Sequence, residues 1–387
     1  MTKKYNIVII GAGAAGMFAA KYARQNGHSV AVIDMGNTPG RKVAVSGGGR
    51  CNFTNLAVAP DRYFGNNKNF VRGALARFTP SDMINWMHQH KFKIVEKAAG
   101  QYFCANGAIA VVNELKKDVR DSDFILNTTV TGVDKHDKNF IVHTSGGDIT
   151  SDKVIVATGG TSFATLGVSD IGYKIAKHFG HKIVPVRPAL CAMKTNVFPH
   201  ELSGISLPVA IHTGHETIYD DLLFTHFGIG GPAVYRATVR NIEKNITIDF
   251  APNTDIYEFL HQIKQTNGKK SISAALAQVL PERVARWVCD TDCTSRIADI
   301  RDTELRKITE RIKHVVVMIN DIQYHSLASA EVVRGGVDTA DISSKTMESK
   351  LCPGLYFIGE VLDIAGDLGG FNLHWAWASG FTAGNAA

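Results

Sequence analysis

The sequence of 387 residues lacks paired cysteines and long hydrophobic runs, and each absence argues against a class of protein. Six cysteines are present, but none forms a CxxC pair, and Cys289 and Cys293 have no histidine or cysteine partner at zinc-site spacing. No stretch of roughly 18 apolar residues occurs, so a membrane-spanning helix is not expected. We therefore expect a cytoplasmic protein with reduced thiols, no bound metal and no membrane partner.

The N-terminal residues resemble a secretory signal, because the basic MTKK precedes an apolar run. Three glycines, Gly11, Gly13 and Gly16, interrupt that run. The interruption favours a folded segment over a cleaved signal.

Dense clusters of one charge are also absent. Positive charges exceed negative ones by six, yet the longest basic clusters are short, such as Lys3-Lys4 and Lys116-Lys117. A nucleic-acid partner is therefore not expected, and a small-molecule substrate is. The length predicts roughly two or three domains and does not indicate the oligomeric state.

The first 34 residues match a dinucleotide-binding unit. The apolar YNIVII predicts a buried parallel strand, GAGAAG matches G-x-G-x-x-G, and MFAAKYARQNG predicts a helix that ends at Gly27. A second strand, HSVAVID, ends at Asp34. In such a unit Gly11 makes the turn, Gly13 admits a pyrophosphate, Gly16 lets the helix pack closely, and the acid accepts from ribose hydroxyls. The pattern does not distinguish FAD from NAD.

The C-terminal segment favours a flavin. VIVATGG, residues 154–160, predicts another buried strand, and LYFIG precedes Glu360 and Asp363. Gly369-Gly370 then opens a helix at Phe371-Asn372. A second helix N-terminus suits a second electron-rich group, and a flavin ring that carries negative charge when reduced fits this requirement.

Residues 41–55, RKVAVSGGGRCNFTN, have a composition that favours neither strand nor helix. Glycine backbone permits close approach of a ligand, and an arginine supplies a rigid fork of donors. Cys51 has no second cysteine within a few residues, so we interpret it as a buried, inert thiol and not as half of a redox disulfide.

Together these segments resemble the bacterial FAD-dependent oxidoreductases that are grouped with aminoacetone oxidase and a bile-acid enone reductase. The matching stretches are GAGAAG, GRKVAVSGGGRCNFTN, ATGGTSFATLG, LLFTHFGIGGPAV, RGGVDTADI and GLYFIGEVLDIAGDLGGFNLHWAWASG. The resemblance implies an α/β fold, in which a two-dinucleotide-binding-type (Rossmann-like) FAD domain is interrupted by an inserted β-barrel-like and helical domain. The implied ranges are 1–188 and 346–387 for the FAD domain and 189–345 for the insertion, which is β-rich in 189–252 and 314–345 and helical in 253–313.

The resemblance also implies that the segment after the second strand runs beside the flavin. The expected FAD-binding residues are Gly11, Gly13, Ala14, Ala15, Gly16, Asp34, Met35, Arg41, Lys42, Ser46, Gly47, Gly48, Gly49, Arg50, Cys51, Asn52, Val130, Ala157, Thr158, Gly159, Gly160, Gly359, Glu360, Asp363, Gly369, Gly370, Phe371, Asn372 and Leu373. Four positions depart from the family pattern, namely Cys104, Asn106, Phe371 and His374. These departures leave the substrate open.

Within the insertion, the sequence predicts short strands over residues 190–250, then helices, the first capped by Asn253-Thr254. GIGGPA, residues 228–233, matches G-x-G-x-x-A and leaves open a second site, for NAD(P)H. Pro232 argues against it, because proline removes an amide where phosphates need donors. The resemblance places this turn on the substrate side of the flavin.

The expected chemistry is hydride transfer through flavin N5. His226 and His374 are candidates for proton transfer, and a hydrogen-bonded structural histidine is the alternative for each. The main hypothesis is an FAD-dependent oxidoreductase of a small organic substrate, either an O2-using amine oxidase or an NAD(P)H-dependent enone reductase. Two alternatives stay open, a flavin-dependent tRNA-modifying enzyme and a non-catalytic redox sensor, although the sequence shows neither a basic surface nor a signalling domain.

Overall fold

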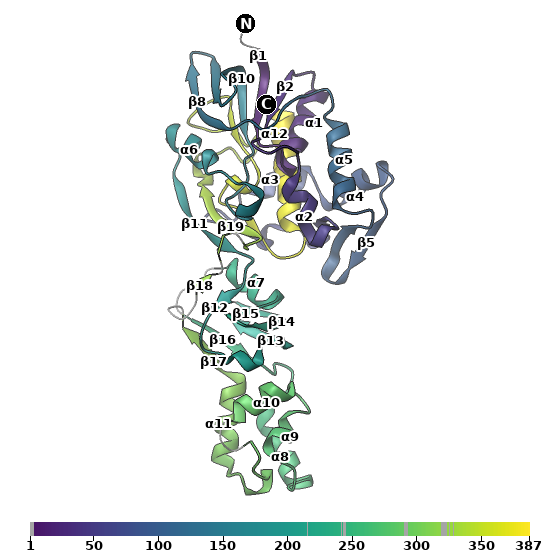
Figure 1. The fold of residues 1–387 in the computed structure, drawn as a ribbon, viewed down its shortest axis with the longest axis vertical. Coiled ribbons are helices and arrows are strands. Elements are labelled where there is room, and N and C mark those ends of the chain that lie inside the picture. The colour runs from purple at the N-terminus through teal and green to yellow at the C-terminus, as the bar shows by residue number, and fades with distance from the viewer. Residues whose placement is uncertain are drawn as a thin grey trace. The chain divides into compact units, whose positions relative to one another are not determined.

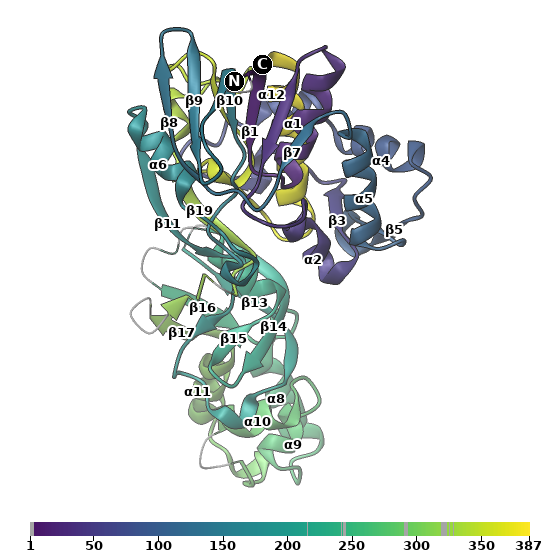
Figure 2. The ribbon, with the colours of Figure 1, turned by 45° about the horizontal axis from the view of Figure 1, so that its top comes forward.

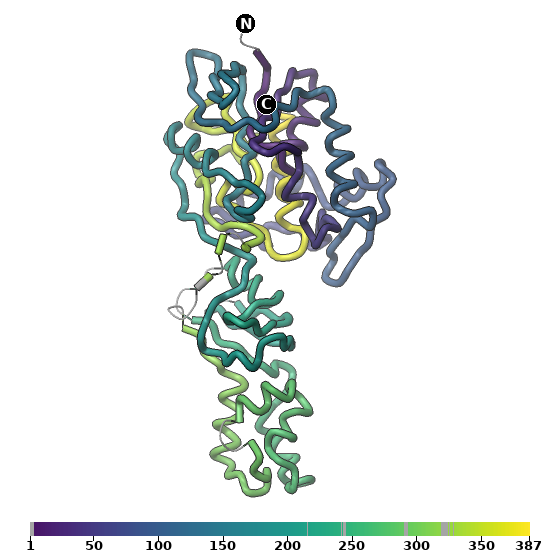
Figure 3. Tube along the Cα trace, in the orientation of Figure 1, coloured from purple at the N-terminus to yellow at the C-terminus, as the bar shows by residue number. Residues whose placement is uncertain are grey.

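The computed structural model describes residues 4–387 except 215, 241, 243, 244, 290–292, 319–322, 325 and 328. The chain divides into two compact units, one formed by residues up to Pro188 together with Leu327–Ala387, the other by Ala189–Ser326. The trace leaves the first unit once and returns to it once, so the first and last segments of the chain fold together (Figure 3).

The end of the insertion differs from the expected one. Residues 327–345 were expected in the insertion, but they belong to the first unit. Strand β19 (Val332–Val337) pairs with β11 (Ile183–Ala189) in a two-stranded sheet, which fixes this segment to the first unit.

A seven-stranded sheet forms the centre of the first unit. Its parallel strands are β7 (Asp123–Ile125), β2 (Val30–Ile33), β1 (Lys4–Ile10), β10 (Ile149–Val156) and β20 (Leu355–Phe357). An antiparallel hairpin, β8 (Val130–His136) and β9 (Asn139–Thr144), pairs with the first half of β10. Residues 7–10 and 30–33 are buried throughout, as expected for parallel strands that are covered on both faces.

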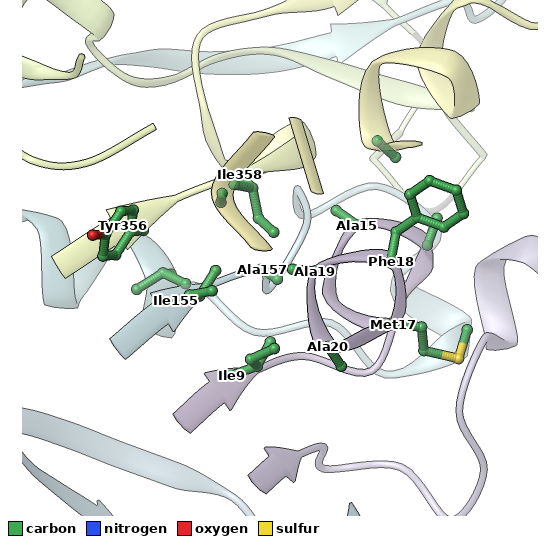
Figure 4. Packing of buried hydrophobic residues seen from close by; sticks show 14 of the residues in the cluster. Ile9, Ala15, Met17, Phe18, Ala19, Ala20, Ile155, Ala157, Tyr356 and Ile358 are labelled. Atoms are coloured by element: carbon green, nitrogen blue, oxygen red, sulfur yellow. The ribbon is translucent and has the colours of Figure 1, made fainter. Parts of the chain in front are cut away.

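Helices α1 (Ala14–Gln25) and α12 (Phe371–Ala386) pack against each other over this sheet (Figures 1 and 2). Two glycines of α12 make the close contact possible. A Cβ atom at Gly380 would lie 2.6 Å from the Ala15 carbonyl oxygen, and one at Gly384 would lie 2.5 Å from that of Ala19. Figure 4 shows the small side chains of α1 in one buried cluster with residues from the strands. The first and last elements of the chain therefore form one core.

A second, smaller sheet of three antiparallel strands lies beside this core, in the order β3-β6-β5. Its strands are β3 (Asn52–Asn55), β6 (Gln101–Cys104) and β5 (Ile94–Lys97), and β4 (Tyr63–Phe64) pairs separately with β21 (Ala365–Gly366). The other helices of the first unit are α2 (Arg41–Gly49), α3 (Arg72–Arg77), α4 (Pro80–Gln89), α5 (Ala108–Asp118) and α6 (Ile171–His178).

The second unit contains another seven-stranded sheet, largely antiparallel, with its own hydrophobic core. Its strands, in sheet order, are β17 (Val315–Met318), β16 (Asn245–Asp249), β13 (Ser206–His212), β14 (Thr217–Thr225), β15 (Gly228–Gly230), β12 (Met193–Lys194) and β18 (Gln323–Tyr324). Its helices are α7 (Pro232–Thr238), α8 (Ile256–Thr266), α9 (Ile272–Leu276), α10 (Glu282–Cys289) and α11 (Asp302–Lys313).

The expected cap of the first insertion helix is displaced by one residue. Asp255, not Asn253 or Thr254, caps α8, because its carboxylate accepts from the Glu258 N–H at 3.1 Å. Across the described residues, no helix is long and apolar enough to cross a bilayer.

Candidate functional site

The turn between β1 and α1 is closed by protein on one side and open on the other. A Cβ atom at Gly11 (φ +110°) would lie 2.3 Å from the Ala157 carbonyl oxygen, and one at Gly16 would lie 1.9 Å from that of Gly11. A Cβ atom at Gly13 would meet no protein atom within 4 Å. Among the three glycines of the turn, Gly13 is therefore the one with open space beside it, and it is the N-cap of α1, where Ala14 and Ala15 begin the helix.

Asp34 lies at the end of β2, where a ribose-binding acid is expected. Its carboxylate accepts from the Ala12 N–H at 2.8 Å and the Gly36 N–H at 2.7 Å, and it pairs with Arg41 at 3.1 Å. The Arg41 guanidinium also donates to the carbonyl of Leu166. Asp34 thus fixes the turn, and Arg41 connects it to the loop that follows β10.

Residues 41–45 form a helix, contrary to the expectation that this stretch favours none. Helix α2 begins after Gly40, which has a left-handed φ of +72°, and breaks at Ser46. Gly47, Gly48 and Gly49 then have φ between +56° and +79°, a region that glycine adopts without steric cost. Residues 47–50 are exposed, and a Cβ atom at Gly48 or Gly49 would meet nothing within 4 Å. The glycines thus form an open backbone turn.

Cys51 follows this turn and is fully buried. Burial raises the pKa of its thiol to about 12. The fold brings Cys104 beside it, since the Cys104 N–H donates to the Cys51 carbonyl at 3.3 Å, a proximity that the sequence does not reveal. Both thiols are free, and burial also raises the pKa of Cys104. This environment favours inert thiols.

Lys42 joins three distant segments. Its ammonium group lies 2.6 Å from a Glu360 carboxylate oxygen and 2.7 Å from the Ser162 hydroxyl. The other Glu360 oxygen accepts from the Val333 N–H at 3.0 Å. A Cβ atom at Gly160 would lie 2.4 Å from Val333 and 3.0 Å from the Glu360 carboxyl, so Thr158, Gly159 and Gly160 pass close to this network.

The N-terminus of α12 lies against the small sheet. Gly369 and Gly370 have φ of +106° and +97°. A Cβ atom at Gly370 would lie 2.5 Å from the Thr54 carbonyl and 2.9 Å from the Asn52 side chain, and one at Gly369 would lie 2.9 Å from Gln101. The first-turn amides of α12, those of Phe371, Asn372 and Leu373, precede its first i→i−4 bond and form a partly positive helix end.

Two of the predicted ligand side chains, those of Asn372 and Asp363, form hydrogen bonds within the protein. The Asn372 side chain accepts from the Gly366 N–H at 2.7 Å and donates to its carbonyl at 3.0 Å. Asp363 is buried and accepts from the Asn66 N–H at 2.9 Å and the Gly335 N–H at 3.2 Å, and its burial raises the carboxyl pKa. These side chains order the loops around the α12 N-terminus.

His374 is placed as a structural residue. It is fully buried, its Nε2 donates to the Phe78 carbonyl at 3.1 Å, and its Nδ1 lies 2.9 Å from the Thr54 hydroxyl. Burial lowers the pKa of the imidazole to about 4. Since both ring nitrogens are occupied and the ring stays neutral, this environment favours the structural alternative over proton transfer.

His226 lies in the other unit, exposed at the turn between β14 and β15, with its ring centroid 4.8 Å from that of Phe227. The neighbouring GIGGPA segment forms β15 and the start of α7. β15 is antiparallel to both β14 and β12. The second nucleotide site that the sequence left open needs a parallel βαβ unit, so this geometry argues against it.

Of the remaining predicted residues, Gly359 lies near the β1–α1 turn, whereas no contact given above links Val130 or Met35 to it. Gly359 adjoins the first turn of α1, since a Cβ atom on it would lie 3.0 Å from that of Ala15. Val130 is buried in the core, and Met35 is 41% exposed beyond the end of β2. The contacts above thus bring together the β1–α1 turn, Asp34, residues 157–160 and Gly359-Glu360.

Several residues of this arrangement were not predicted. Thr54 and Ser162 lie within matching stretches, GRKVAVSGGGRCNFTN and ATGGTSFATLG, but are not among the expected binding residues. Gln101 and Arg62 lie outside these stretches, and the fold brings all four residues to the site. Arg62 pairs at 3.0 Å with the fully buried Asp367 in the loop before α12. The sequence offers only one hint, the acid in the segment IAGDLGG that precedes the helix.

The residues present fit a dinucleotide with an electron-rich ring. The open space at Gly13 lies at a helix N-terminus, Asp34 stands at the end of β2, where a ribose-binding acid is expected, and the open glycine turn and the α12 N-terminus both adjoin Asn52. FAD has all of these parts.

Comparison with known proteins gives one family and several relatives. The family profile described as "HI0933-like protein Rossmann domain" matches residues 5–386. The chain is 37% identical over 391 residues to the ribosomal RNA dihydrouridine synthase of Escherichia coli (strain K12), covering 97% of this chain and 96% of that protein. It is 40% identical over 387 residues, with the same coverage, to the ribosomal RNA dihydrouridine synthase of Haemophilus influenzae. It is 28% identical to the 3-dehydro-bile acid delta(4,6)-reductase of Clostridium scindens over 98% of both chains.

These relatives confirm the resemblance to flavin-dependent oxidoreductases that include a bile-acid reductase, and they correct one expectation. The absence of a nucleic-acid partner was inferred from the lack of long basic clusters. Two relatives that match nearly the whole chain are ribosomal RNA dihydrouridine synthases, so that inference is wrong. Short clusters in the sequence are a poor guide to a surface that the fold assembles from separate segments.

Proposed function

We propose that this chain, which belongs to the HI0933-like family and is an FAD-dependent oxidoreductase, reduces a uridine in ribosomal RNA to dihydrouridine. One observation carries the proposal. Two relatives with that activity match 97% of the chain, at 37% and 40% identity. The match includes both units, so it covers the insertion as well as the flavin domain.

The chemistry of the third relative supports the same class of reaction. The double bond of uracil that is reduced in dihydrouridine is conjugated to a carbonyl group, as are the double bonds of a 3-keto steroid with unsaturation at positions 4 and 6. Both reductions add a hydride to a carbon remote from the carbonyl and a proton to the adjacent carbon. This shared chemistry supports placing the reduction of uridine in the same reaction class as the relative's steroid reduction.

When bound, FAD supplies the hydride for this reduction. The residues of the chain would hold it in sections. The α1 N-terminus at Gly13 would bind the pyrophosphate and Asp34 the ribose. The turn Gly47–Gly49 and the first turn of α12 would lie along the remainder, where the partly positive helix end stabilises negative charge.

We further propose NADH or NADPH as the electron donor. A net reduction of RNA consumes two electrons per uridine, so the enzyme requires a reductant that is not the RNA. Anaerobic mixing of the yellow protein with each nicotinamide in a stopped-flow spectrometer should bleach the flavin with one of them. Failure of both would contradict this donor and leave the RNA reaction to be tested with a chemically reduced flavin.

The main experiment measures dihydrouridine directly. Ribosomal RNA from a bacterial strain that lacks its own rRNA dihydrouridine synthase is incubated with purified protein and NADPH, digested to nucleosides and analysed by mass spectrometry. We expect a nucleoside that is heavier than uridine by two hydrogens. The matched control is the Gly13→Val variant, which should lack flavin. Absence of dihydrouridine with fully flavin-loaded, reducible protein would contradict the proposal.

A further inference from the structure

Positive charge is concentrated in one continuous part of the first unit. Residues 41–120 contain 13 lysines and arginines against 5 aspartates and glutamates, whereas the rest of the chain contains 29 against 31. The charge is dispersed among α2, the small sheet and helices α3 to α5, so it forms no long run in the sequence. The net positive charge of the protein therefore originates in this segment.

The lysines and the glutamate of the β5–β6 hairpin lie on opposite faces of the small sheet. Val95 pairs with Phe103 and Lys97 with Gln101, so these four side chains share one face of the small sheet. Lys93 lies two residues before Val95, so its side chain is on the same face, and its carbonyl accepts from the Ala105 N–H at 2.8 Å, which extends the pairing by one residue. Glu96 points to the opposite face, where its carboxylate accepts from the Tyr102 hydroxyl at 2.8 Å. The first face carries lysines and no acid from this hairpin.

Cations from two segments meet on this face. The Lys97 ammonium lies 4.6 Å from the centre of the Phe103 ring, and the Arg50 guanidinium lies 5.6 Å from it. Arg50, Lys93 and Lys97 are exposed, and in the described part of the chain none of them forms a salt bridge. By contrast, Lys42 and Arg62 in the same segment are paired. Unpaired cations held close together favour an anionic partner.

This face continues into the proposed flavin site. Gln101 lies on it, and the side-chain amides of Gln101 and Asn52 are hydrogen-bonded at 2.9 Å. A Cβ atom added at Gly369, in the turn before α12, would lie 2.9 Å from the Gln101 side chain, so the two residues are in close contact. Figures 1 and 2 both show the β5 strand and α2 near the yellow loop that leads into α12. A strand of polyanion along the face would therefore reach the α12 N-terminus.

We propose that the basic sheet face, formed by Arg50, Lys93, Val95, Lys97, Gln101 and Phe103, binds the sugar–phosphate backbone of the RNA strand next to the target uridine. The inference rests on the proposed function, and it assigns the substrate a position on the protein. Lysines and arginines neutralise phosphates, Val95 offers an exposed apolar contact to a base or sugar, and the amides of Gln101 and Asn52 present donors and acceptors beside the ring site. The RNA is bound in an unstacked, single-stranded conformation, because a base within a helix cannot reach the site.

The test uses the full-length holoprotein and ribosomal RNA transcribed in vitro. Binding is measured by fluorescence anisotropy at several salt concentrations for wild type, for Lys93→Gln/Lys97→Gln and for a matched control, Lys138→Gln/Lys177→Gln. The control also removes two exposed lysines of the first unit without salt bridges in the described structure, but they lie outside residues 41–120. Flavin content and the rate of bleaching by NADPH report on folding and on the flavin site.

We expect the Lys93/Lys97 variant to bind RNA about tenfold more weakly, with a salt slope reduced by about 1.4, while its flavin content and bleaching rate match wild type. The control variant should bind like wild type, and Lys93→Arg/Lys97→Arg should retain binding. Unchanged affinity and slope in the Lys93/Lys97 variant would overturn the assignment, as would an equal loss in the control. Wild-type protein that neither binds RNA nor forms dihydrouridine would contradict the proposed function itself, an outcome that the wild-type measurement alone identifies.

Discussion

The ammonium group of Lys42 lies 2.6 Å from the carboxylate of Glu360, although the two residues are separated by 318 positions in the chain. Lys42 belongs to the helix that precedes the open glycine turn, and Glu360 follows strand β20. The ion pair therefore joins the two parts of the FAD domain that the insertion separates in sequence.

This pair should contribute measurably to the folding of the first unit. We expect the double-mutant cycle of Lys42→Met and Glu360→Gln to give a coupling energy of about 1 kcal/mol, because the Glu360 carboxylate is mostly buried and Lys42 is about one-third exposed. Chemical unfolding of the four proteins measures this energy. Additive effects of the two single substitutions would show that the pair contributes nothing.

Gly13 offers a way to remove the cofactor without disturbing the fold. Its φ of −79° is open to any residue, and a Cβ atom there meets no protein atom. We expect Gly13→Val to fold with a melting temperature close to that of flavin-free wild type but to be colourless, since the side chain occupies the space for the pyrophosphate. Flavin absorbance per protein and thermal unfolding measure the two effects.

Gly16→Ala is the contrasting variant. Its Cβ atom would lie 1.9 Å from the Gly11 carbonyl oxygen, so it should lower the melting temperature of the flavin-free protein as well. A yellow Gly13→Val protein with full occupancy would remove Gly13 from the site.

The loop before α12 depends on the pair of Arg62 and the fully buried Asp367. We expect Arg62→Met to lower the free energy of unfolding by about 2 kcal/mol, because it leaves a buried carboxylate without its cation. Hydrogen exchange should increase in residues 366–373. Arg72→Met, which removes an exposed arginine, is the control and should change neither quantity. Equal exchange in both variants would show that the pair does not order the loop.

His374 should make stability depend on pH. Its pKa is about 4 in the folded protein against an ordinary value of 6.5, so the unfolded chain binds the proton more tightly. The stability that the neutral imidazole provides is complete above about pH 6.5 and is lost as the pH falls toward 4, a loss of roughly 3 kcal/mol. Unfolding experiments between pH 7 and 4 on wild type and His374→Gln should show a smaller decline in the variant. Parallel curves would contradict the assigned environment.

Much of the fold follows from short-range patterns. The spacing of Gly11, Gly13 and Gly16 and the acid at position 34 predict the turn, helix and strand. The positive φ of Gly11 and the contact of Gly16 with the Gly11 carbonyl both require glycine, and Gly13 leaves open space at the helix N-terminus. Gly369-Gly370 similarly predicts the start of α12. The sequence prediction for residues 41–45 is wrong, because the glycines that follow them dominate the composition while the five residues themselves form a helix.

The candidate site was less predictable from sequence. Gln101 lies outside the stretches that carry the resemblance, and Ser162 is one unremarked residue of such a stretch. Only the fold places them beside Asn52 and Lys42. The basic sheet face has no sequence signature for a related reason. Its charges are contiguous in space but interrupted by apolar and polar residues along the chain.

By itself the sequence determined the dinucleotide turn and the second glycine-led helix, because both are encoded in backbone requirements and hydrophobic periodicity over a few residues. The interruption of the flavin domain is implied by the resemblance to a known family and not by any short pattern. Only the tertiary structure decided that the side chains of His374 and Asn372 are hydrogen-bonded to the protein, and that the lysines of one hairpin share a face free of the hairpin's acid. Burial, hydrogen-bond partners and the sum of nearby charges depend on which distant segments meet, and no short stretch of sequence contains that information.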